Sequence, residues 1–188
     1  MTPNFKRSVA RGFTLIELLI VVIILAILAA IAIPQFSAST SDAQLAALDS
    51  NLAAVRTAME QYKVQHTGNV YPGAVLSTGT CPTAAGANIA GAALSQAAIE
   101  AQLKYPTNAA GMACTVATTE YKYGPYLRQG LPTEPINSST TLAITSTGAT
   151  LTGGAATTGW AYDTVSGQFI MNSSADDKTG KTRTYAQH

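Results

Sequence analysis

An apolar stretch near the N-terminus constrains this chain more than any other feature. Residues 13–33 contain only two polar side chains, Thr14 and Glu17, and every residue from Leu18 to Ile33 is apolar. A helix rises about 1.5 Å per residue, so these residues span roughly 30 Å, the thickness of a bilayer's hydrocarbon core. The stretch therefore predicts a membrane-spanning helix.

The short segment before this stretch predicts its orientation and processing. Residues 1–12 carry Lys6, Arg7 and Arg11 but no acidic residue, which places the N-terminus in the cytoplasm. An ordinary secretory signal is cleaved after its apolar core, whereas here the small residue Gly12 lies before the core. Cleavage after Gly12 would remove the charges and leave the apolar helix on the protein.

Two other interpretations of the apolar stretch are a secretory signal and a plain membrane anchor. Residues 30–32 read Ala-Ile-Ala and fit a secretory cleavage site that would release a soluble domain. Glu17 argues against both, because an ionisable group at the centre of a membrane helix costs on the order of 2.5–3.5 kcal/mol and calls for a partner. After cleavage, the free ammonium of Phe13 would supply one. If that pair forms between neighbouring subunits, Glu17 fixes their axial offset.

The helical pattern continues beyond Pro34, which ends the apolar run and predicts a kink. Apolar residues then recur at helical spacing at Leu45, Leu48, Leu52, Val55, Met59 and Tyr62. This stripe predicts an amphipathic second half that packs on the rest of the chain. We expect one helix from about Phe13 to His66, ended by Gly68 and Asn69.

Residues 69–188 are expected to form a globular head. Residues 69–135 read as a long connection with one helix over 88–104, and residues 136–172 read as short strands. The strand candidates are 142–145, 159–163 and 168–172, with residues 164–167 as a hairpin turn between the last two. Residues 173–188 read as a polar, frayed tail. The predicted fold is α+β: a ladle in which a long kinked helix packs on a small antiparallel sheet.

The rest of the sequence contains few residues that could bind a metal or catalyse a reaction. Cys81 and Cys114 are too few for a structural zinc site, and in an exported domain we expect them to form one disulfide, with two free thiols as the alternative. Asp176 and Asp177 read as solvated charge in the tail rather than a calcium site. The chain has two histidines and no common catalytic pattern. We therefore expect no enzyme activity, no metal and no cofactor. The net charge of +1 gives no reason to expect nucleic-acid binding.

The run from Arg11 through Glu17 to Phe36 resembles the N-terminal signature of type IV pilins and of the type II secretion pseudopilins. The resemblance implies that a prepilin peptidase cuts between Gly12 and Phe13, that the new amine of Phe13 is methylated, and that Glu17 is the acid of the family's signature. Residues 31–36, Ile-Ala-Ile-Pro-Gln-Phe, resemble major type IV pilins.

The resemblance also implies an organisation and a set of partners. Residues 1–12 would be a removed leader, 13–34 the membrane and filament-core helix, and 35–68 its amphipathic continuation. The partners would be copies of the chain in a helical homopolymer, the prepilin peptidase, the membrane before assembly, and an inner-membrane platform with its ATPase. The chain would move from the inner membrane to an extracellular pilus, or, as the alternative, to a periplasmic pseudopilus.

Overall fold

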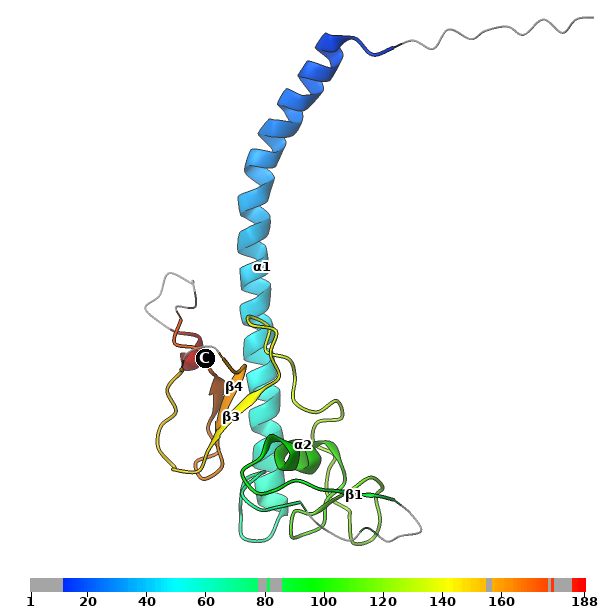
Figure 1. The fold of residues 1–188 in the computed structure, drawn as a ribbon, viewed down its shortest axis with the longest axis vertical. Helices are drawn as coiled ribbons and strands as arrows, with labels where there is room; N and C mark the ends of the chain where they lie inside the picture. Colours follow the sequence, from blue (N-terminus) through cyan, green and yellow to red (C-terminus); the bar gives the residue numbers. More distant parts are fainter. Residues whose placement is uncertain (1–11, 78–80, 82–85, 155–156, 176, 178–183) are drawn as a thin grey trace, which may run out of the picture. The chain divides into compact units, whose positions relative to one another are not determined.

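The structure is a computed structural model, and it describes residues 12–77, 81, 86–154, 157–175, 177 and 184–188 (Figure 1). Residues 1–11 of the predicted leader, and Asp176, lie outside the described residues. The chain divides into two units, residues 1–42 and residues 43–188.

The long helix α1 runs from Leu15 to Gln65, close to the predicted bounds of 13–66. It continues through the position of Pro34, and the kink expected there stays a prediction. The chain leaves the helix through Gly68 and Asn69, whose φ angles of 83° and 51° are left-handed. Glycine and asparagine adopt this conformation at little cost, and they commonly end helices.

The amphipathic stripe of α1 forms the core of the head, as its spacing predicts. Leu48, Leu52, Val55, Met59 and Tyr62 are almost completely buried. They share one hydrophobic cluster with side chains from the strands and from the C-terminal segment, including Trp160, Tyr162, Phe169 and Tyr185. Trp160 and Tyr162 are thus packing residues, and they are not exposed as a ligand platform would be.

The three predicted strands form one sheet, in the order β3-β4-β5. Their bounds are Leu142–Thr145 for β3, Trp160–Asp163 for β4 and Phe169–Met171 for β5. The predicted β4–β5 hairpin is confirmed, since these strands are antiparallel with Tyr162 opposite Phe169. The prediction of a wholly antiparallel sheet is wrong, because β3 and β4 are parallel. Parallel neighbours need a long crossover, which residues 146–159 provide.

The connection between α1 and the sheet is more structured than predicted. Helix α2 covers only Gln96–Lys104, because Ser95 caps it by accepting the Ala98 N–H at 3.2 Å. The preceding Leu94 has a φ of 58°, outside the helical region. The predicted helix over 88–104 is therefore too long. Its first residues instead form β1 (Asn88–Ile89), which pairs antiparallel with β2 (Ala113–Cys114).

The described part of the C-terminal tail is ordered against the head rather than frayed. A short 3-10 helix, η1 (Tyr185–Gln187), buries Tyr185 in the core cluster. Asp177, expected to be solvated, is completely buried and lies 3.2 Å from His188 Nε2. The other ring nitrogen of His188 contacts Asp49 of α1 at 2.7 Å. These contacts join residues that are far apart in the sequence. The polar composition of the tail therefore did not indicate that it packs on the head.

Candidate functional site

The bond predicted to be cleaved lies outside the helix. Gly12 and Phe13 precede α1, and the Phe13 side chain is 88% exposed. A Cβ atom built on Gly12 would meet no other atom within 4 Å. The Gly12–Phe13 bond therefore lies in exposed, non-helical backbone.

The first turn of α1 is held by a capping box between Thr14 and Glu17. Glu17 Oε2 accepts both the Thr14 N–H at 2.8 Å and the Thr14 hydroxyl at 2.6 Å. In return the Glu17 N–H donates to Thr14 Oγ1 at 3.2 Å. Each residue thus satisfies a backbone or side-chain group that the helix start leaves unpaired.

This geometry changes the interpretation of Glu17. From its sequence position Glu17 is expected to be a charge within a membrane helix, but the structure places it in the first turn of α1, where a carboxylate also complements the helix dipole. The full midplane cost therefore does not apply. The role of Thr14 was not predicted, although the spacing Thr-x-x-Glu before an apolar run is a recognised sign of a capping box.

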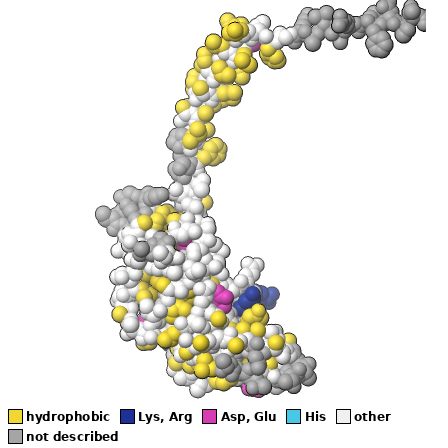
Figure 2. All heavy atoms as spheres, viewed as in Figure 1, with side chains coloured by type: hydrophobic (Ala, Val, Ile, Leu, Met, Phe, Trp, Pro, Cys, Tyr) yellow, Lys and Arg dark blue, Asp and Glu magenta, His cyan; other side chains and the backbone are white. Residues whose placement is uncertain are grey.

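The helix beyond this turn presents an uncovered apolar surface. Leu15–Ile33 has a mean hydropathy of 3.3 and is long and apolar enough to cross a membrane. None of this segment is buried within the chain, and Figure 2 shows hydrophobic side chains along it. Exposed apolar area on this scale requires a lipid or protein environment.

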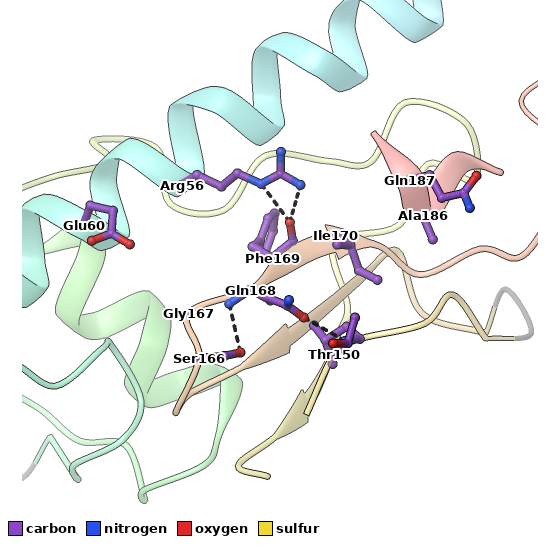
Figure 3. Close-up of a pocket in the computed structure, with 11 residues that line it drawn as sticks. Arg56, Glu60, Thr150, Ser166, Gly167, Gln168, Phe169, Ile170, Ala186 and Gln187 are labelled. Carbon is purple, nitrogen blue, oxygen red and sulfur yellow. Dashed lines mark hydrogen bonds between the residues drawn. The ribbon is translucent and has the colours of Figure 1, made fainter. Parts of the chain in front are cut away.

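The head contains a groove of about 550 Å³ between α1 and the β4–β5 hairpin (Figure 3). The Arg56 guanidinium donates from Nε and Nη2 to the Phe169 carbonyl oxygen at 3.0 and 2.8 Å. Glu60 accepts the Tyr71 hydroxyl at 2.6 Å. Arg56 thus joins α1 to β5, and Glu60 joins α1 to the segment that contains Tyr71.

A disulfide joins Cys81 to Cys114, the pair that the cysteine count suggested, with the Cα atoms 5.6 Å apart. Both residues are buried, in a small second cluster with Tyr121. Because Cys114 lies on β2, the bond fastens residue 81 to the β1–β2 ribbon. It precedes the main sheet in the sequence and lies outside it.

We expect the disulfide to stabilise the head by about 3–4 kcal/mol, because it closes a loop across a sequence separation of 33 in the unfolded chain. Thiol labelling of the unfolded, unreduced protein should detect no free thiol. Urea unfolding with and without reductant measures the energy. Labelling of both cysteines would contradict the bond.

The N-terminal segment of the chain is similar in sequence to known proteins. Residues 7–33 match the family model described as the prokaryotic N-terminal methylation motif. The chain is 51% identical over 59 residues to the type IV narrow pilus major component PilA5 of Thermus thermophilus, covering 31% of this chain and 51% of the relative. It is 50% identical over 54 residues to the type IV major fimbrial protein FimA of Dichelobacter nodosus, covering 29% and 35%.

A second kind of relative is also similar. The chain is 36% identical over 61 residues to the type II secretion system core protein G of Pseudomonas aeruginosa, covering 32% of this chain and 43% of the relative. The chain thus spans about a third to a half of the length of these relatives. No solved structure matches it. These relatives are pilus, fimbrial and secretion-system components, and none of the three is named as an enzyme.

Proposed function

Because this chain belongs to the type IV pilin and pseudopilin family, we propose that it is the polymerising subunit of a type IV pilus. Residues 1–12 are the leader that a prepilin peptidase removes, and the new amine of Phe13 is then methylated. The precursor lies in the inner membrane through its apolar helix. The mature chain leaves the membrane for an extracellular filament.

The observation that carries this proposal is the order of features at the N-terminus. An exposed Gly12–Phe13 bond precedes the capped start of a helix whose apolar residues 15–33 are uncovered. Cleavage at that bond keeps the helix on the subunit, so the same surface serves first in lipid and then against copies of the chain. Burying this apolar area away from water stabilises the helix both in the membrane and in the assembled filament.

Each segment has a part in this proposal. Residues 13–34 form the filament core and 35–68 connect it to the head, residues 69–188, which remains outside the core. Glu17 pairs with the amine of a neighbouring Phe13 and sets the axial offset between subunits. Assembly requires an inner-membrane platform with its ATPase, because extracting residues 15–33 from lipid is unfavourable without an energy source.

The second candidate is a pseudopilin that forms a short periplasmic filament for type II secretion. The similarity to core protein G of Pseudomonas aeruginosa favours it, whereas the higher identities to PilA5 and FimA favour the pilus.

Electron micrographs of cells with and without the gene distinguish these candidates. A pilus subunit predicts surface filaments that disappear on deletion and return on complementation. A pseudopilin predicts unchanged surface filaments together with a loss of secreted proteins from the medium. Unchanged filaments and unchanged secretion would contradict both.

A further inference from the structure

His66 lies immediately after α1 and links it to a distant part of the head. Its ring is 4% exposed and is held at both nitrogens. Nδ1 lies 2.6 Å from the Tyr62 carbonyl oxygen, and Nε2 lies 2.8 Å from Thr107 Oγ1. Since a carbonyl oxygen only accepts, Nδ1 carries the proton and Nε2 accepts from the Thr107 hydroxyl. The neutral ring is therefore fully satisfied.

Aromatic rings surround this imidazole. Tyr62 stacks on it with ring centroids 3.7 Å apart, and the rings of Tyr123 and Tyr126 lie 5.3 and 6.2 Å away. Phenol rings attract a cation only modestly. They do not replace the hydration that a buried imidazolium loses.

Charged residues on the packed elements are engaged elsewhere. Glu60 and Lys63 contact Tyr71, Glu120 accepts from Asn108, and Lys122 lies over the ring of Tyr123. In the described part of the chain, the histidine that lies within ion-pair distance of acidic side chains is His188, beside Asp49 and Asp177, and not His66. A proton on His66 would thus be buried without a counter-ion.

We propose that His66 is an acid-sensitive latch, whose protonation releases the segment around Thr107 and Tyr123 from the end of α1. Thr107 and Tyr123 exchange both backbone hydrogen bonds, at 2.8 and 3.1 Å, so they move as a unit. A protonated Nε2 needs an acceptor, which forces the Thr107 hydroxyl to turn toward the Tyr123 carbonyl oxygen at 3.5 Å. Thr107 also forms an antiparallel bridge with Ala113 of β2, which keeps the released segment attached to the β1–β2 ribbon.

The sign of the pH effect follows from the neutral form. Burial lowers the pKa of His66 below its ordinary value of 6.5, and the hydrogen bond to the Tyr62 carbonyl only partly opposes this. The unfolded or released chain therefore binds the proton more readily than the closed head does. The latch has its full strength above about pH 6.5 and weakens as the pH falls toward the lowered pKa.

Amide hydrogen exchange of the full chain in detergent tests the latch. Exchange is measured by mass spectrometry at about pH 7.5 and about pH 5, and protection over residues 105–126 is divided by protection over β4 and β5. In the wild type this ratio should fall on acidification, by about tenfold for each unit by which the pKa is lowered. His66→Gln has a donor and an acceptor but does not titrate, so its ratio should not change with pH.

His188→Gln is the matched control, because it removes the other histidine. In this variant the protection ratio should still fall on acidification, and this fall is the pH step. A step that is lost in His188→Gln but kept in His66→Gln would overturn the proposal. If His66→Gln does not fold, an NMR titration of the wild-type ring decides the matter. A pKa of His66 at or above 6.5 would overturn the latch, and a lower value with release of residues 105–126 supports it.

Discussion

Replacing Glu17 by leucine is expected to abolish filaments and leave a folded, membrane-inserted chain. In the proposed filament the Glu17 carboxylate meets the amine of a neighbouring Phe13 in a core that excludes water. Removing the carboxylate leaves a buried, unpaired ammonium, which costs on the order of 3–5 kcal/mol. The loss recurs at every subunit, so filament yield should fall at least about a hundredfold. The leader should still be removed, because the Gly12–Phe13 bond is unchanged.

Glu17→Gln separates registration from helix capping. Glutamine also serves in a capping box, so this variant is expected to keep the contacts with Thr14 while losing the charge. If Glu17 pairs with an ammonium, both variants fail to assemble. The measurement is the amount of chain in sheared filaments, relative to the membrane fraction. Normal assembly of Glu17→Gln would show that Glu17 acts only as a helix cap. Normal assembly of Glu17→Leu would show that filament formation needs neither the cap nor the pairing with the Phe13 amine.

Replacing Asp163 by alanine should destabilise the head more than any exposed substitution. Asp163 ends β4, and its side chain is completely buried. Its oxygens accept the N–H groups of Thr147, Val165 and Ser166 at 2.8, 3.0 and 2.7 Å, and also the Gly148 N–H and the Thr145 hydroxyl. One carboxylate therefore holds both the end of β3 and the turn between β4 and β5.

Several of the donors around Asp163 would lose their partner together in the alanine variant. Each buried unsatisfied group costs about 1–3 kcal/mol, so we expect a loss of about 3–5 kcal/mol in the free energy of unfolding. Ser146→Ala is the matched control, because Ser146 is exposed in the same loop and should change stability by less than about 0.5 kcal/mol. Urea unfolding of the full chain in detergent measures both. A loss below about 1 kcal/mol for Asp163→Ala would contradict the anchoring role.

The pH dependence of this contribution has a defined sign. Burial alone would raise the pKa of Asp163, but hydrogen bonds from Ser166, Gly148, Thr145 and Thr147 outweigh it and hold the pKa well below its usual range. The stabilisation is therefore complete above the unfolded pKa of about 3.9 and is lost as the pH falls toward the folded value. It lies in a more acidic window than the His66 latch, so the two are separable by pH.

The sequence predicted those elements whose signal is local and periodic. The long apolar run and the stripe through Leu48, Leu52 and Val55 located α1 within two residues at each end, because helical spacing and burial point to the same face. The aromatic and β-branched clusters located β4 and β5. Gly159 lies outside β4, as its poor strand propensity allows.

The missed features depend on contacts between distant residues. The parallel pairing of β3 with β4 is stabilised by Asp163, which binds Thr147 and Gly148 at the start of a loop that has no strong sequence pattern. Tyr185 is buried although it lies in a mostly polar tail, and Asp177 is buried beside His188. None of these contacts can be predicted from amino-acid composition. The Thr14–Glu17 box was local, and its spacing was readable from the sequence.

The intact mass of the chain in purified filaments shows directly whether the leader is removed after Gly12 and the apolar helix is kept. Processing after Gly12 predicts a subunit that begins at Phe13, carries one additional methyl group and retains the apolar helix. A chain that begins at Met1, or one that begins after Ala32 and so lacks the apolar helix, would show that this protein is not processed as a pilin subunit.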